Sequence, residues 1–141
     1  MNSAEIRKFL DAYFERYNRF DFEGVVRDCY TEDAILESPL MKLHGREAIL
    51  EWYHNYHKMI PSRLVPKGYI IGDNRAAVEQ HIEFEKGRDL PDFLRPSLFE
   101  GPNGHYLRIV TLYDFRDGRI EKLCAYNFFA GNVTAEKAAR T

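Results

Sequence analysis

The chain has 141 residues, of which 45% are hydrophobic and 14% aromatic, and its formal net charge is −2. This length suits one domain with a single core, and interspersed charges of both signs exclude the basic patch that nucleic acid or an anionic membrane requires. No apolar run approaches the roughly 20 residues of a membrane span, and a charged amino terminus with only two cysteines indicates a cytoplasmic protein with free thiols.

Two helices are predicted at the start of the chain. Asn2 and Glu5 match a capping box, and the apolar residues that follow recur every three or four positions, which predicts a helix over 3–20. Asp21 can cap a second, shorter helix that ends at Tyr30. We expect the two helices to form a hairpin.

Residues 30–53 combine a strand, a corner and the start of a helix. Residues 33–38 predict a short strand, which Pro39 ends because proline cannot donate to a central ladder. Gly45 then opens an amphipathic helix whose apolar residues keep helical spacing until Pro61. Elements in this order are typical of one wall of a pocket.

The second half of the chain predicts two β-hairpins. Their strand-like segments are 64–71 with 76–84, and 106–115 with 119–129. The first pair is joined by Gly72-Asp73-Asn74 and the second by Asp117-Gly118, which are residues that tolerate positive φ. Four long antiparallel strands are therefore expected.

Two segments of the second half predict little regular structure. Residues 86–104 hold three prolines and three glycines, and a loop of this length is usually functional or disordered. After Gly131 the sequence is small and charged, so we expect one domain over 1–131 and a flexible tail over 132–141.

Helices followed by antiparallel strands imply an α+β fold with the helices on one face of a curved sheet. A strongly twisted sheet around helices leaves a cavity between the two layers. Such pockets are mostly apolar with a few polar groups.

The motifs YTEDA, HGREAI and FRDGRI, in this order, resemble the nuclear transport factor 2-like superfamily, in particular its SnoaL-like polyketide-cyclase and ketosteroid-isomerase branch. The resemblance covers nearly the whole chain. It implies a cone-shaped α+β barrel, often a homodimer packed through the outer face of the sheet. The superfamily includes isomerases, cyclases, dehydratases, epoxide hydrolases and members that only bind or assemble, so the fold does not determine the activity.

The resemblance also implies roles for individual residues. Tyr13 lies close to the position of the tyrosine that donates to a developing oxyanion in the isomerase branch, and Tyr17 follows one turn later. Ser38 stands where that branch keeps a general-base carboxylate, and Thr111 lies near the position of a second acidic donor. With both carboxyl groups missing, we do not expect a simple steroid isomerase.

His81 is the candidate proton shuttle, because it alternates with Glu79 and Glu83 on one face of a predicted strand. A carboxylate on each side would raise the pKa of the imidazole toward working pH. The alternative is that this face is solvated or faces a dimer partner. In that case the barrel is filled by the opposite face, which carries Val78, Gln80, Ile82 and Phe84.

Other polar and aromatic residues are candidate ligand contacts. Asn127 would orient a carbonyl or hydroxyl group if it points inward, or it caps the strand end near the surface. Trp52 and Tyr56 line the mouth of the pocket or pack in the core. Asp89 in the long loop would supply the carboxylate that Ser38 lacks if this loop is a lid, or it caps a turn in a surface loop.

Metal and cofactor sites are not expected. His54 and His57 are three residues apart on the predicted helix and could share a metal, but no HExxH or paired-cysteine pattern accompanies them. We therefore predict chemistry without a cofactor.

Three functions remain open from the sequence. The first is a small enzyme that isomerises, cyclises or dehydrates an apolar oxygenated compound, with Tyr13 or Tyr17 stabilising charge, His81 moving the proton and Asn127 orienting the substrate. The second is a protein that binds a hydrophobic small molecule without catalysis. The third is a dimeric assembly module that presents the strand face of Val78, Ile82 and Phe84.

Overall fold

The computed structural model describes residues 1–129, so the predicted tail lies outside the described residues. In chain order the elements are α1 (Ser3–Asn18), α2 (Phe22–Cys29), β1 (Tyr30–Ser38), β2 (Met41–His44), α3 (Arg46–Met59), β3 (Ser62–Gly72), β4 (Arg75–Phe84), the 3-10 helix η1 (Asp92–Ser97), β5 (Leu98–Gly101), β6 (Gly104–Arg116) and β7 (Arg119–Asn127). None of the helices within residues 1–129 is long and apolar enough to cross a membrane.

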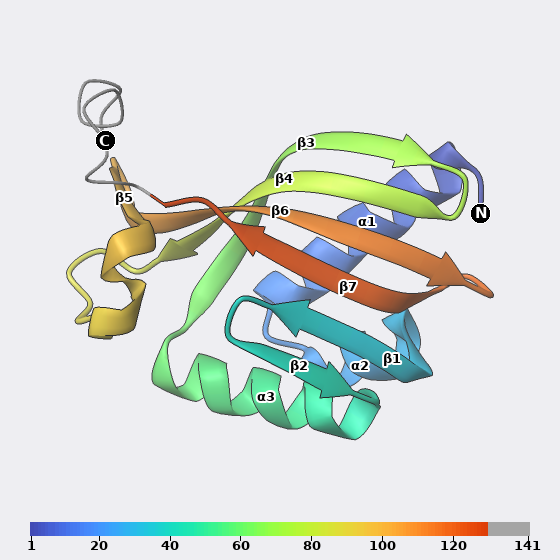
Figure 1. Ribbon diagram of the computed structural model, residues 1–141, viewed down its shortest axis with the longest axis horizontal. Coiled ribbons are helices and arrows are strands. Elements are labelled where there is room, and N and C mark those ends of the chain that lie inside the picture. The colour runs from blue at the N-terminus through green and yellow to red at the C-terminus, as the bar shows by residue number, and fades with distance from the viewer. Residues whose placement is uncertain (130–141) are drawn as a thin grey trace, which may run out of the picture.

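One sheet forms the front layer of the molecule in Figure 1, with the strand order β2-β1-β7-β6-β4-β3 and β5 paired to β6. All neighbouring strands are antiparallel except β1 and β7, which are parallel. The ladders shift register within β1, β3 and the β6–β7 pair. Because such irregularities bend a strand and increase its twist, they curl the sheet.

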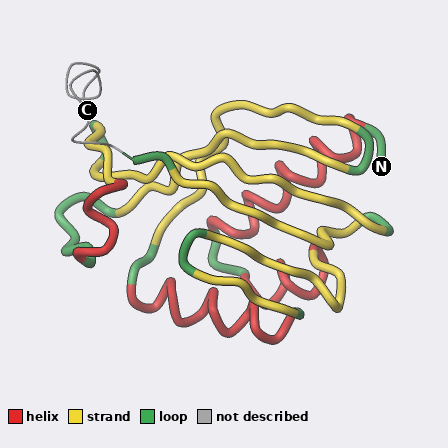
Figure 2. Tube along the Cα trace, viewed as in Figure 1, coloured by secondary structure: helices red, strands yellow, loops and turns green. Residues whose placement is uncertain are grey.

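The helices cover the concave side of this sheet, with α1 behind the strands and α3 along the lower edge (Figures 1 and 2). The capping box is confirmed, since the Glu5 amide donates to Asn2 Oδ1 at 2.9 Å and the Asn2 amide donates to Glu5 Oε1 at 3.1 Å. The buried face of α1 then repeats at helical spacing through Ile6, Leu10, Tyr13, Phe14 and Tyr17. Helices packed on a curved, mostly antiparallel sheet confirm the predicted α+β cone.

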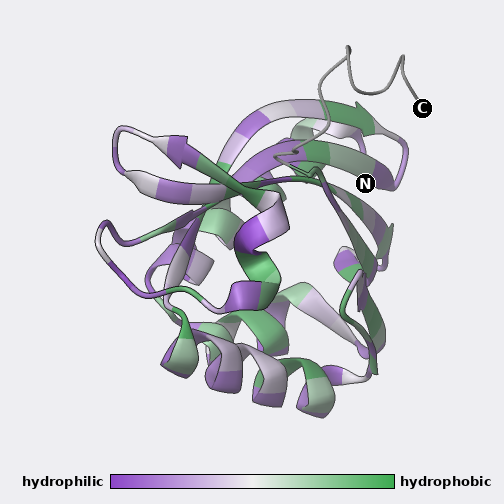
Figure 3. Cartoon of the chain, turned by 60° about the vertical axis from the view of Figure 1, so that its left-hand side comes forward, coloured by the Kyte–Doolittle hydropathy of each residue, from purple (hydrophilic) through white to green (hydrophobic). Residues whose placement is uncertain are grey.

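The strands alternate between the core and the outer face, and Figure 3 shows the corresponding changes of hydropathy along the chain. In β4, Val78, Gln80 and Phe84 are 0%, 1% and 3% exposed. Glu79 and His81 therefore lie on the outer face. This placement decides between the two faces that the sequence left open, and it excludes an assembly surface built from Val78, Ile82 and Phe84.

Two short elements were missed at the sequence level. β2 has only four residues and pairs with β1 from Ser38 to Ile35. The loop 86–104 contains η1 and β5, because Leu98 and the three residues after it pair with the start of β6. β2 and β5 each have only four residues and pair with the neighbouring strand in the sequence, and strands this short give little periodic signal.

Candidate functional site

A cavity of about 110 Å³ lies between the helices and the concave face of the sheet. Most of its lining is apolar and includes Leu36, Leu64, Ile82, Leu107, Ile109 and Leu123. An engineered cavity of about 150 Å³ in another protein binds one benzene molecule. The cavity therefore suits roughly one ring, with further atoms of a larger ligand reaching toward the opening.

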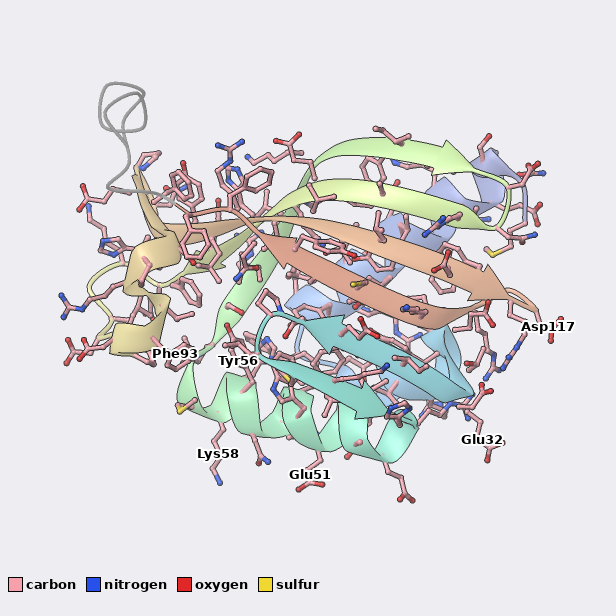
Figure 4. All side chains as sticks on the ribbon, in the orientation of Figure 1. Glu32, Glu51, Tyr56, Lys58, Phe93 and Asp117 are labelled. Atoms are coloured by element: carbon pink, nitrogen blue, oxygen red, sulfur yellow. The ribbon has the colours of Figure 1, made fainter. Side chains whose placement is uncertain are left out.

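The opening lies where the β1–β2 turn, α3 and η1 meet. Leu40 in the turn lines the cavity although it is 61% exposed. Trp52 and Tyr56 of α3 are half-buried and stack with ring centroids 4.8 Å apart, and Leu94 of η1 also contributes to the lining. Tyr56 and Phe93 of η1 lie at this end of the molecule (Figure 4). The loop 86–104 thus contributes the apolar side chain of Leu94 to the cavity.

Three tyrosine hydroxyls form a closed cluster against the buried face of α1. Tyr13 Oη lies 3.1 Å from Tyr30 Oη and 3.3 Å from Tyr53 Oη, and the latter two are 2.6 Å apart. Burial raises the pKa of Tyr13 and Tyr30 well above the ordinary value, and it also raises the pKa of Tyr53. All three groups are therefore neutral hydrogen-bonding hydroxyls near pH 7.

Tyr17 and His57 form a second buried pair. Tyr17 Oη lies 3.0 Å from His57 Nε2, and His57 Nδ1 lies 2.9 Å from the Tyr53 carbonyl oxygen. Ser62 Oγ is 3.5 Å from the same Nε2. Burial lowers the pKa of His57 to about 4, so the imidazole is neutral near pH 7. Because Tyr17 and Ser62 both line the cavity, His57 lies directly behind its wall.

The sheet side of the cavity carries one buried amide. Gln80 Nε2 donates to Thr111 Oγ1 at 2.5 Å and to Tyr113 Oη at 3.3 Å, while its Oε1 has no partner. All three residues line the cavity and are 1% exposed. A buried polar atom without a partner is unfavourable, so this oxygen is a candidate anchor for a ligand.

The described residues of the lining include no Asp, Glu, Lys or Arg. A charged ligand would therefore lose its hydration without gaining a counter-ion. Proton transfer inside the cavity has to involve tyrosine hydroxyls or His57 behind Tyr17. The site is thus built for a neutral, mostly apolar molecule with one or two polar groups.

The sequence profile of the SnoaL-like domain matches residues 10–123. The chain belongs to the SnoaL-like domain family. No curated protein matches it by sequence.

Solved structures share the SnoaL-like architecture at low sequence identity. A candidate ketosteroid isomerase from Kribbella flavida is 17% identical, with 94% of this chain and 84% of that chain covered and a TM-score of 0.71. A candidate polyketide cyclase from Xanthomonas campestris is 20% identical over 89% of this chain and 92% of that chain, with a TM-score of 0.69. A de novo designed protein with a curved β-sheet is 17% identical over 91% and 88%, with a TM-score of 0.66. These similarities establish the fold, and the designed protein shows that this fold can form without a natural function.

Most of the residues singled out in the sequence meet at the SnoaL-like cavity. Its lining includes Tyr13, Tyr17, Ser38, Trp52, Tyr56 and Asn127. The Ser38 hydroxyl accepts a hydrogen bond from the Leu40 amide at 3.2 Å, so it also stabilises the turn at the opening. Asn127 ends β7, opposite Ile109 of β6.

The structure removes two predicted residues from the site. His81 lies on the outer face of β4 and stacks on Tyr106 with ring centroids 4.4 Å apart. Burial and the nearby Lys67 lower the pKa of His81, although the sequence predicted that Glu79 and Glu83 would raise it. Neighbouring residues of a strand point to opposite faces, so with Gln80 buried in the core His81 has to lie on the outer face.

Asp89 is the second predicted residue that lies outside the cavity. It is exposed in the loop before η1 and is not part of the lining. The loop turns the apolar side chain of Leu94 inward, because Leu94 packs with Ile60, Phe84 and Leu107. An unpaired carboxylate at that position would lose its solvation, whereas leucine gains from burial.

Sequence reasoning missed several polar site residues, among them His57 and Gln80 and their neighbours Ser62 and Tyr113. His57 follows Tyr53 by four residues and so lies on the same buried face of α3, and this spacing was a usable signal of inward orientation. Gln80 shares a strand face with Val78 and Ile82, and the sequence predicted this shared face but no role for Gln80. In the part of the chain that the structure describes, no three His, Cys, Asp or Glu side chains gather as a metal site.

Proposed function

We propose that this SnoaL-like protein binds a neutral, apolar small molecule that carries at least one oxygen, with its ring in the cavity. The observation that carries this proposal is an apolar cavity lined by uncharged hydroxyl and amide groups. Apolar walls provide the affinity through burial, and the few polar groups orient the ligand. A homodimer packed through the outer face of the sheet and a cytoplasmic location remain predictions of the family resemblance and the composition.

Binding of toluene, an apolar ring probe, tests the proposal by isothermal titration calorimetry. We expect saturable binding to the wild-type protein and at least tenfold weaker binding to Ala125→Leu, because Ala125 lines the cavity and the larger side chain fills it. Ala12→Leu is the matched control, since Ala12 is exposed on α1.

The control variant should bind like the wild type, and Ala125→Val should give an intermediate loss if Ala125→Leu does not fold. A wild-type protein without saturable binding, or equal affinity in all variants, would refute a ligand in this cavity.

A second candidate function is acid–base catalysis on the bound molecule, of the isomerase, cyclase or dehydratase type. The pair of Tyr17 and His57 favours it, because a neutral imidazole within 3.0 Å of a hydroxyl that belongs to the cavity wall can accept a proton through that hydroxyl. In this version His57 takes the role that the sequence gave to His81, and the Asn127 amide, which lines the cavity, holds the substrate oxygen.

A further inference from the structure

The Tyr17 hydroxyl is fixed in one hydrogen-bonding direction by His57. A carbonyl oxygen only accepts, so the contact of 2.9 Å between His57 Nδ1 and the Tyr53 carbonyl requires the proton to be on Nδ1. A neutral imidazole then has its lone pair on Nε2. Tyr17 Oη lies 3.0 Å from Nε2 and Ser62 Oγ lies 3.5 Å from it, so the nearer Tyr17 hydroxyl donates its proton to this lone pair.

This arrangement leaves Tyr17 Oη with acceptor capacity only. A tyrosine hydroxyl has one proton, and His57 takes it, so a ligand in the cavity meets the lone pairs of this oxygen. The aromatic rings around His57 hold the imidazole in place, with the Phe22 centroid at 4.4 Å and the Tyr56 centroid at 5.1 Å. The ring cannot turn to free the proton without losing both hydrogen bonds.

The neighbouring hydroxyl cluster has no free proton either. Tyr13, Tyr30 and Tyr53 make three mutual contacts with three hydroxyl protons, so a closed ring of hydrogen bonds uses all of them. On the sheet side, Gln80 Oε1 is a buried acceptor without a partner. Acceptors on two sides of the cavity thus lack a donor.

We propose that the cavity selects a ring compound that carries a hydrogen-bond donor, such as a phenolic or alcoholic hydroxyl, and that Tyr17 Oη, oriented by His57, accepts this hydrogen bond. This inference rests on the proposed binding function and names the ligand class. A ketone or ether with no donor fits the same space but leaves both acceptors unfilled. Tyr17 is the specificity-determining residue, and His57 is a positioning residue.

Calorimetry with phenol, toluene and anisole tests the selection. Phenol and toluene have nearly the same size, so the ratio of their dissociation constants reports the contribution of the phenol hydroxyl to binding. The cost of desolvating phenol is the same for every variant, so it cancels when this ratio is compared between proteins. We expect the dissociation constant of toluene divided by that of phenol to fall at least fivefold in Tyr17→Phe, which is the scale of one neutral hydrogen bond. Tyr69→Phe is the matched control, because Tyr69 donates to Asp11 outside the cavity, and it should keep the wild-type ratio.

His57→Phe provides a readout that a purely structural role would not change. Without the imidazole acceptor, Tyr17 regains a proton that it can donate, so anisole should gain affinity relative to toluene and the advantage of phenol over anisole should shrink. If His57→Phe does not fold, the Tyr17→Phe result decides alone. If Tyr17→Phe still binds toluene and keeps the wild-type preference for phenol, the donor proposal is overturned but the binding function stands. If the wild-type protein binds none of the three probes, the binding function itself is refuted.

Discussion

His57 is a titratable residue that is only 7% exposed, held between the Tyr53 carbonyl and the Tyr17 hydroxyl. Its burial has two consequences. It keeps the imidazole neutral, which orients the Tyr17 proton, and it makes the folded state sensitive to acid. His54 and Lys58 of the same helix border one surface hollow with His57, and His54 further lowers the pKa of the imidazole.

Stability should therefore fall in mild acid because of this residue. The folded-state pKa of about 4 is below the ordinary value of 6.5, so the unfolded chain binds the proton more tightly. The stability contribution is complete above about pH 6.5 and is lost as the pH falls toward 4, by about 3 kcal/mol in total. Chemical denaturation of wild type and His57→Phe between pH 7 and pH 4 would measure it.

The variant should lose this pH-dependent component of the free energy of unfolding. His44→Gln, at an exposed position of β2, should retain the wild-type slope. An unchanged slope in His57→Phe would show that other groups cause the acid sensitivity.

At the scale of elements, the corner between β2 and α3 sets the position of the helix that carries Tyr53, Tyr56 and His57. Gly45 has φ 86 and ψ 158, a conformation that essentially only glycine adopts. Its amide donates to the Ala34 carbonyl at 2.7 Å, and so ties the corner to β1. The Arg46 guanidinium adds two hydrogen bonds to the Tyr30 carbonyl, at 3.0 and 2.8 Å.

Gly45→Ala should destabilise the protein by about 2 kcal/mol through backbone strain alone. A Cβ at this position would lie 3.7 Å from the Glu32 carbonyl oxygen, which is an ordinary contact, so no steric clash contributes. Gly68→Ala is the control, because a Cβ there meets no atom within 4 Å and its φ is unexceptional. Thermal and urea unfolding should separate the two variants, and equal stabilities would argue against strain at the corner.

At the scale of the whole molecule, the two faces of the sheet have different roles. The concave face forms the cavity and the core. The outer face carries Val110 opposite Tyr126 and Leu112 opposite Cys124, and Tyr126 is 55% exposed. Apolar groups in register on an exposed sheet face are typical of an interaction surface, and this face is where the family resemblance predicts a homodimer.

Val110→Glu should convert that dimer to a monomer, since dimerisation would bury an unpaired carboxylate. Light scattering on the purified protein measures the mass directly. Met59→Glu is the control, because Met59 is 61% exposed on α3, away from this face. A wild-type monomer would contradict the predicted dimer, and a dimer that survives Val110→Glu would contradict the face. Ile82, which lines the cavity, is unsuitable for this test.

The sequence by itself determined the helices α1, α2 and α3, the two long hairpins β3–β4 and β6–β7, and the family. Local signals were sufficient there, since the capping box at Asn2 and the turn residues Asn74 and Asp117, both with φ of 52, act over a few residues. Only the tertiary structure decided the polar chemistry of the site. Strand alternation defines two faces but not which one is buried, and pairing with β6 in a curved sheet turned Gln80 inward and His81 outward. The contact between Tyr17 and His57 joins residues 40 positions apart, so helical spacing indicates that each residue faces inward, and only the packing of α1 and α3 brings the two together.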